Sequence, residues 1–182
     1  MKLIKTDIPE VLVFEPSVHG DQRGYFFETW RADNFASAGV EQTFVQDNQS
    51  SSNQGVLRGL HYQIKQPQGK LVRVISGRVF DVAVDLRRQS PTFGRWVAVE
   101  LSGENKRLFW VPPGFGHGFY VLSESAEFVY KCTNYYSPQH ERVIRFDDPD
   151  IGIAWPLLAG VETLLSEKDL GGASFAEAEV FA

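Results

Sequence analysis

The clearest pattern along the chain is an alternation of apolar and polar positions with a period of two. In residues 79–86 the even positions, from Phe80 to Leu86, are all apolar, whereas Asp81 and Asp85 fall on the opposite face. This period is typical of a β-strand with one buried face and one exposed face. We therefore expect a half-buried strand here, bounded by Gly77 and by the turn signals of residues 89–94.

Other short apolar runs, each bounded by Gly, Pro, Asn or Ser, predict further strands. The stronger candidates are residues 71–75, 96–101, 107–111, 118–122 and 127–133, and the weaker ones are 11–14, 25–30 and 43–49. About nine short strands at this spacing predict a β-sandwich or barrel. Helical patterns are few and short, at residues 33–39 and 160–165. We interpret the polar run 49–55 as a loop.

Composition limits the class of protein. The 182 residues are 43% hydrophobic and 23% charged, which predicts one folded domain over residues 1–182, with 171–182 as a loose tail. The single Cys132 excludes an intramolecular disulfide and a multi-cysteine metal site. A net charge of -5 provides no general attraction for nucleic acid. No run approaches the roughly 20 apolar residues of a membrane-spanning helix.

Two of the four histidines lie in informative places. His61 follows a polar run and a strand start, and His117 follows a Pro-Pro-Gly turn between two glycines. Each is interpreted either as a structural hydrogen-bonding residue or as a catalytic group. Small β-barrels with a turn of this kind often hold a metal by adding a His-x-His pair and a Glu, but Gln63 stands two residues after His61. We therefore expect no metal.

Cations and tyrosines lie near these histidines. Arg23, Arg58 and Lys70 are either solvated loop charges or, if they face inward, cations that need an anion such as a phosphate or a developing oxyanion. Tyr130 is in phase with Phe128 on a predicted strand and so either fills the core or points a phenol into the barrel. At the end of that strand, either Tyr135 or Tyr136 is placed to stack on a flat ligand.

Several segments in order resemble the dTDP-4-dehydrorhamnose 3,5-epimerase family of the cupin superfamily. They are 21–28, 46–48, 55–63, 69–70, 91–94, 111–119, 130–136, 148–156 and 166–169, so the resemblance covers about residues 1–170. It implies an all-β, cupin-type jelly-roll barrel or sandwich with a few short peripheral helices. The implied reaction inverts C3 and C5 beside the C4 ketone of a dTDP-linked 4-keto-6-deoxyhexose, in dTDP-rhamnose biosynthesis.

The resemblance also implies roles for individual residues. His61 matches the base and Tyr130 the proton donor on the opposite face of the sugar, while Lys70 matches the residue that faces the C4 oxygen. Asp169, with Glu167 as the alternative, matches the carboxylate that orients His61. Substrate contacts are implied for Arg23 and Arg58 at the diphosphate, Tyr136 at thymine, and His117, Glu28, Gln46, Asp47, Asn48, Glu141 and Lys168 elsewhere.

The family resemblance implies a cytoplasmic homodimer that exchanges strands, with neither metal nor organic cofactor and no nucleic-acid or membrane partner. Two alternatives remain close to it: a sibling epimerase that inverts only C3 or only C5, and a non-catalytic cupin that binds a nucleotide sugar. A metal-dependent cupin dioxygenase or isomerase is a third.

Overall fold

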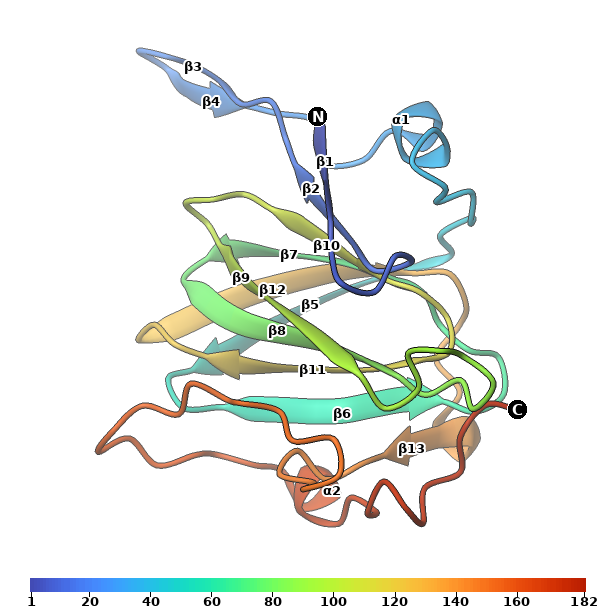
Figure 1. The fold of residues 1–182 in the computed structure, drawn as a ribbon. Helices are drawn as coiled ribbons and strands as arrows, with labels where there is room; N and C mark the ends of the chain where they lie inside the picture. The colour runs from blue at the N-terminus through green and yellow to red at the C-terminus, as the bar shows by residue number, and fades with distance from the viewer.

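Two antiparallel sheets face each other in the computed structural model, which describes all of residues 1–182 (Figure 1). The six-stranded sheet has the order β1 (Lys2–Lys5), β2 (Leu12–Glu15), β10 (Leu108–Val111), β7 (Lys70–Ser76), β12 (Ser125–Cys132) and β5 (Gln46–Asn53). The five-stranded sheet has the order β13 (Glu141–Val143), β6 (Leu57–Gln63), β11 (Phe115–Val121), β8 (Arg78–Asp85) and β9 (Trp96–Ser102). The remaining elements are the hairpin β3 (His19–Asp21) and β4 (Gly24–Phe26), the helices α1 (Ala32–Ala36) and α2 (Glu167–Leu170), and the 3-10 turn Pro138–His140. The predicted all-β sandwich with few short helices is confirmed.

The alternation of side chains along each strand builds the core between the sheets. On β7 and β12, for example, Val72, Val74 and Phe128 point inward and are almost fully buried. A second cluster covers one end of the outer face of the six-stranded sheet, where the ring of Phe35 in α1 lies 4.3 Å from that of Phe14. The short helix predicted at residues 33–39 is thus confirmed as α1, and Phe35 anchors it.

The strand β8 is buried on both faces, so the prediction that Asp81 and Asp85 lie on an exposed face is wrong. Both aspartates have no solvent-exposed surface. The reason is that residues 144–181 cross the outer face of the five-stranded sheet and cover the side of β8 that carries Val82 and Val84. Asp81 therefore points into the sandwich, between the inward-facing Val79 and Ala83.

Two local predictions also need correction. The polar run at residues 49–55 is mostly the strand β5 rather than a loop, because its backbone pairs with β12, where Gln49 is opposite Val129. Residues 160–165 form no helix, because Leu164 exchanges backbone hydrogen bonds with Gly55 and Leu57. The helix α2 begins instead after Ser166, which caps it.

The C-terminal residues, for which the sequence suggests a loose tail, make defined contacts with the sandwich. Phe181 donates a backbone hydrogen bond to Leu86 over 3.0 Å and accepts one from Arg88 over 2.8 Å. The ring of Phe175 lies 5.0 Å from that of Phe93. None of the helices is long and apolar enough to cross a membrane.

Candidate active site

A small cavity opens between the two sheets, with chemically active side chains on both walls. His61 on β6 and His117 on β11 are paired in register on the five-stranded sheet. Lys70 on β7 and Tyr130 on β12 line the cavity from the six-stranded sheet. Its volume is about 80 Å³, and the remaining lining residues are Tyr62, Gln63, Gln68, Val111, Phe115, Tyr136 and Glu141. The fold thus brings together groups that lie up to 80 residues apart in the sequence.

His61 is held by a buried aspartate. Its Nε2 lies 2.6 Å from Oδ1 of Asp169, which is 3% exposed. Asp169 also accepts hydrogen bonds from the backbone N–H of Gly59 at 3.0 Å and from the hydroxyl and N–H of Ser166. The capping box of α2 fixes this arrangement, because Asp169 is the third residue after the Ser166 cap. Asp169, and not the exposed Glu167, is the carboxylate at His61.

Gly59 makes this contact possible. Its φ of +132° is one that residues with a side chain rarely adopt, and a Cβ at this position would lie 2.5 Å from the Cα of Gly118 on the neighbouring strand. The close approach of β6 and β11 at this point aims the Gly59 N–H at Asp169. Gly59 is therefore needed to position Asp169 beside His61.

A second carboxylate approaches the other side of the His61 ring. Glu141 at the start of β13 places Oε1 3.5 Å from Nδ1 of His61. Its Oε2 accepts hydrogen bonds from Nζ of Lys168 at 2.7 Å and from the hydroxyl of Tyr136 at 2.9 Å. Three of the residues with implied ligand contacts, Glu141, Lys168 and Tyr136, therefore form one polar group beside His61.

The electrostatics of this group follow from its hydrogen bonds. Burial by itself would lower the pKa of His61, but the hydrogen bonds to Asp169 and Glu141 outweigh it and raise that pKa. Burial would raise the pKa of Asp169, yet the donors His61, Ser166 and Gly59 hold it well below its usual range. The contact with His61 is the largest cause that lowers the pKa of Glu141 to about 2.

His117 forms the second histidine–aspartate pair of the cavity. Its Nε2 lies 2.9 Å from Oδ1 of Asp81, and both side chains are buried. The other oxygen of Asp81, Oδ2, is buried without any hydrogen-bond partner. Burial lowers the pKa of His117 and raises that of Asp81. Sequence reasoning missed Asp81, although the apolar residues Val79 and Ala83 on its own face of the strand were a signal that this face is buried.

Lys70 and Tyr130 lie side by side on the opposite wall. Nζ of Lys70 is 5.9 Å from the ring centroid of Tyr130. Protein surrounds the ammonium group, which lowers the pKa of Lys70, while the charges of Cys132, Asp81 and Glu141 oppose this effect. Burial also raises the pKa of Tyr130, so its phenol is protonated near neutral pH.

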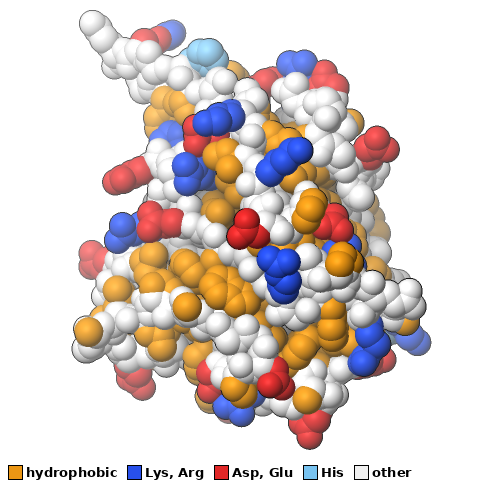
Figure 2. All heavy atoms as spheres, viewed as in Figure 1, with side chains coloured by type: hydrophobic (Ala, Val, Ile, Leu, Met, Phe, Trp, Pro, Cys, Tyr) orange, Lys and Arg blue, Asp and Glu red, His pale blue; other side chains and the backbone are white.

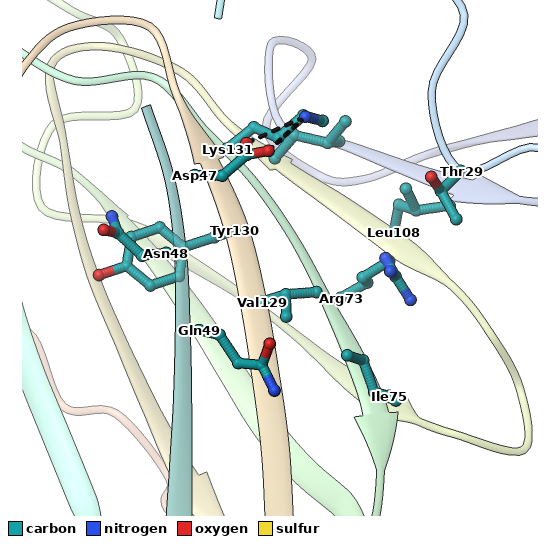
Figure 3. Close-up of a pocket in the computed structure, with 11 residues that line it drawn as sticks. Thr29, Asp47, Asn48, Gln49, Arg73, Ile75, Leu108, Val129, Tyr130 and Lys131 are labelled. Atoms are coloured by element: carbon teal, nitrogen blue, oxygen red, sulfur yellow. Dashed lines mark hydrogen bonds and ion pairs between the residues drawn. The ribbon is translucent and has the colours of Figure 1, made fainter. Parts of the chain in front are cut away.

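The residues of β5 divide between the two faces of their sheet. Gln46 and Asn48 point inward, where Gln46 accepts a hydrogen bond from the Tyr136 N–H at 2.9 Å. Asp47 points outward and binds Nζ of Lys131 at 2.9 Å (Figure 3). Asp47 therefore lies outside the cavity of its own chain. Figure 3 shows Asn48 and Tyr130 projecting from adjacent strands on the other side.

Three further predicted contact residues lie at the rim or outside. Arg58 is exposed near the start of β6, whereas His61, Tyr62 and Gln63 line the cavity from the other end of the strand, and it donates to Oγ of Ser52 at 3.1 Å. Arg23 and the exposed Glu28 lie in and after the β3–β4 hairpin, which extends beyond the body at the end opposite β6 and α2 (Figures 1 and 2). Arg23 binds only Asp21 of the same hairpin. A single chain therefore does not bring Arg23 or Glu28 to the His61 cavity.

A larger hollow of about 480 Å³ lies on the outer face of the six-stranded sheet (Figure 3). Most of its lining comes from outward-facing residues of β5, β7 and β12, among them Gln49, Arg73, Ile75 and Val129. It contains no histidine and no cluster of titratable groups other than the Asp47–Lys131 pair. In the whole chain, no group of three or more His, Cys, Asp or Glu side chains is arranged to hold a metal ion.

Comparison with known proteins identifies relatives of this arrangement. The sequence model of the family described as dTDP-4-dehydrorhamnose 3,5-epimerase matches residues 5–177. The epimerase of that name from Pseudomonas aeruginosa is 58% identical over 182 residues, which cover 100% of this chain and 99% of the relative.

Solved structures agree with the sequence comparison. The dTDP-6-deoxy-D-glucose-3,5-epimerase of Legionella pneumophila, in complex with dTDP-4-keto-L-rhamnose, superposes with a TM-score of 0.95 at 53% identity and covers 98% of this chain and 94% of that one. A 3'-monoepimerase from Streptomyces bikiniensis, in complex with dTDP-quinovose, reaches a TM-score of 0.88 at 37% identity, with 94% and 87% covered. The fold is thus shared by enzymes that invert different numbers of carbons.

Proposed function

The chain belongs to the dTDP-4-dehydrorhamnose 3,5-epimerase family, an isomerase-class family of carbohydrate epimerases, and we propose that its sandwich cavity is the active site. There a dTDP-4-keto-6-deoxyhexose loses and regains a proton at C3 and at C5, which gives dTDP-4-dehydro-L-rhamnose. One observation carries this proposal: His61 and Tyr130 stand on opposite sheets across one cavity. Inversion requires a base and an acid on opposite faces of the sugar.

His61 is the base in this scheme. Asp169 accepts the Nε2–H of the neutral ring, which leaves the lone pair of Nδ1 free to take a proton from carbon. Removal of a proton beside a ketone produces an enolate, whose oxygen needs a positive charge nearby. Lys70 supplies that charge at the C4 oxygen from the opposite wall. No metal is required for this step.

Tyr130 is the acid. Its partly buried phenol keeps its proton near neutral pH and faces the cavity from the six-stranded sheet. A proton removed by His61 on one face is thus replaced from the other face, and the carbon is inverted. The same pair serves C3 and C5 in turn if the sugar repositions between the two steps.

The nucleotide is bound at the rim of the cavity. We assign the diphosphate to Arg58, the thymine ring to Tyr136, and further contacts to Gln46, Asn48 and Lys168. His117 contacts the sugar from the floor of the cavity. A free buried thiol at Cys132 and a nucleotide-sugar substrate are compatible with a cytoplasmic location, which we include in the proposal.

Arg23, Glu28 and Asp47 enter the scheme through a second copy of the chain. We propose a homodimer in which the β3–β4 hairpin of one protomer reaches the site of its partner, because this hairpin extends from the body and exposes Tyr25 and Phe26 by 62% and 69%. The hollow on the outer face of the six-stranded sheet supplies surface for such an interface.

Mixing two inactive variants tests the shared site. Arg23→Ala and His61→Ala chains, when combined, should form mixed dimers with one intact site, and about a quarter of the wild-type sites should return. Size-exclusion chromatography with light scattering reports the dimer itself. A monomer, or no recovery of activity in a mixture that does exchange subunits, would contradict the homodimeric site.

Deuterium incorporation from D₂O into dTDP-4-keto-6-deoxyglucose tests the reaction. We expect exchange at both C3 and C5, unaffected by a chelator. Exchange at one carbon alone would favour a sibling monoepimerase. Binding of dTDP without any exchange would favour a non-catalytic nucleotide-sugar cupin, and loss of exchange with a chelator would favour a metal-dependent enzyme.

The variant Tyr130→Phe separates the two halves of the mechanism. It should retain exchange by His61, while formation of epimerised product falls about 10²–10⁴-fold, as is typical for loss of a general acid. Exchange and product are both read by NMR of the same reaction. Undiminished product formation would exclude Tyr130 as the donor.

A further inference from the structure

The His61 ring lies between two carboxylates that come from different parts of the chain. Asp169 of α2 meets Nε2 at 2.6 Å, and Glu141 of β13 stands 3.5 Å from Nδ1. The two carboxylate side chains are 3% and 15% exposed, and the His61 side chain is 27% exposed. The nitrogen that must accept a proton from the substrate is therefore already faced by an anion.

Glu141 is held in this position by the two residues that we assign to the nucleotide. Lys168 and Tyr136 both bind Oε2, at 2.7 and 2.9 Å, which leaves Oε1 turned toward His61. The pKa of Glu141, about 2, keeps this group ionised throughout the physiological range. The carboxylate is thus a fixed negative charge beside His61.

The charged groups around His61 shift its pKa in opposite directions. Asp169 from α2 and Glu141 from β13 favour the imidazolium, while the charge of Lys70 on β7 opposes it. His117 on β11 and Tyr130 on β12 line the same cavity, and both are neutral near pH 7 in our account. The two carboxylates outweigh burial and Lys70 and raise the pKa of His61, and an imidazolium would offer one N–H to each carboxylate.

We propose that Glu141 keeps His61 protonated before substrate binds and that the incoming substrate draws Glu141 away from Nδ1, so that the base is freed only in the substrate complex. This inference rests on the proposed function, since it assumes that His61 is the base. A shift of the Tyr136 side chain as it stacks on thymine and an anionic contact at Lys168 would break the two bonds that hold Glu141, and the diphosphate charge would repel it. Ligand binding and proton release are then linked through the same residues.

Glu141 acts through His61 and is a positioning residue, so its test needs a readout of protonation. We would titrate His61 by NMR in the wild type, in Glu141→Gln and in Glu162→Gln, each with and without dTDP. Glu162 is exposed and makes no contact with His61, so its variant controls for the loss of one charge. The Glu141→Gln variant keeps the side-chain shape.

The pKa of His61 should fall by about 1 or more in Glu141→Gln, because an adjacent opposite charge is lost. Addition of dTDP should lower it in the wild type but barely change it in Glu141→Gln. On the acid limb of the pH–rate profile, kcat/KM follows the fraction of His61 that is deprotonated. A fall of 1 in the pKa of His61 therefore raises kcat/KM about tenfold there, so the variant should be faster than the wild type at low pH. The Glu162→Gln control should titrate as the wild type does.

An unchanged or raised pKa of His61 in Glu141→Gln would overturn the inference, and so would a wild-type His61 whose titration ignores dTDP. The D₂O exchange assay on Glu141→Gln separates this failure from failure of the proposed function. If Glu141→Gln exchanges at C3 and C5 but the acid limb of its pH–rate profile is not shifted, the role of Glu141 is refuted and the proposed reaction stands. Absence of exchange in the wild type refutes the reaction.

Discussion

Two histidine–aspartate pairs lie on neighbouring strands of the same sheet, and their surroundings give them opposite charge preferences. His61 and His117 are partners in the β6–β11 register, and each places Nε2 within 2.9 Å of an aspartate oxygen. Yet the pKa of His61 is raised and that of His117 is lowered.

The difference lies in burial and in the neighbouring groups: His61 has a second carboxylate, Glu141, at its other nitrogen, whereas His117 is more deeply buried and has none. The two aspartates also differ in what else they contact. Asp169 accepts three further hydrogen bonds, from Ser166 and Gly59, which stabilise its negative charge. Asp81 has one oxygen with no partner in a fully buried position, so its charge is poorly stabilised. A histidine–carboxylate pair therefore does not define a base by itself; burial, the other charges at the ring and the donors around the carboxylate together set the charge preference of the ring.

The largest expected effect comes from removal of the base. His61→Ala should lower kcat about 10²–10⁴-fold, as is typical for loss of general base catalysis, while affinity for dTDP is largely retained. Steady-state kinetics together with calorimetric titration of dTDP measure both. His117→Ala is the matched change in the other pair, and it should act mainly on KM. Equal losses of kcat in His61→Ala and His117→Ala would contradict the assignment of different roles to the two histidines.

Asp169→Asn should have the next largest effect. The amide no longer favours the imidazolium and does not fix the tautomer that presents Nδ1, so kcat should fall about 10²-fold or more. Because the carboxylate raises the pKa of His61, its loss should also move the acid limb of kcat/KM to lower pH. A pH–rate profile with an unmoved acid limb would argue against Asp169 as the partner of the base.

Asp81→Asn should have a smaller effect, within about tenfold in kcat at pH 7. The negative charge of Asp81 helps to keep Lys70 protonated, so its removal should lower the pKa of Lys70 further. The basic limb of the pH–rate profile should then move to lower pH, while the acid limb stays in place. A shift of the acid limb instead would mean that Asp81 acts on His61.

The smallest effect concerns stability. The pKa of Asp169 is lowered in the folded protein, so its contribution is complete above its unfolded pKa of about 3.8 and is lost as the pH falls below that value. The pKa of Asp81 is raised, so its ionisation above pH 3.8 disfavours the folded state.

Urea unfolding at pH 3 and pH 6 compares the two aspartates. Relative to the wild type, the gain in unfolding free energy between these pH values should be smaller in Asp169→Asn and larger in Asp81→Asn, each by about 1 kcal/mol. The same sign of change in both variants would contradict the opposite environments.

The amino-acid sequence was sufficient for the fold class, because the period-two alternation and the turn residues mark most strands directly. It could not reveal that β8 is buried on both faces. The covering residues 144–181 contain little regular secondary structure, so no periodic pattern in the sequence predicts that they pack across the sheet. For the same reason Asp81 looked like a solvated residue.

The candidate site shows a similar division. Resemblance pointed to His61, Lys70 and Tyr130, which the fold brings to one cavity. The choice between Asp169 and Glu167 needed the orientation of α2, which depends on the Ser166 cap. The position of Arg23 outside the cavity depends on how a hairpin extends from the body, which local sequence does not encode.

One measurement tests the contrast between the two pairs most directly: an NMR titration of both histidine rings in a single sample of the substrate-free protein. We expect His61 to lose its proton above the usual pKa of about 6.5, and His117 to remain neutral until well below it. Two histidines that titrate together, or a His117 that is protonated at higher pH than His61, would contradict the account.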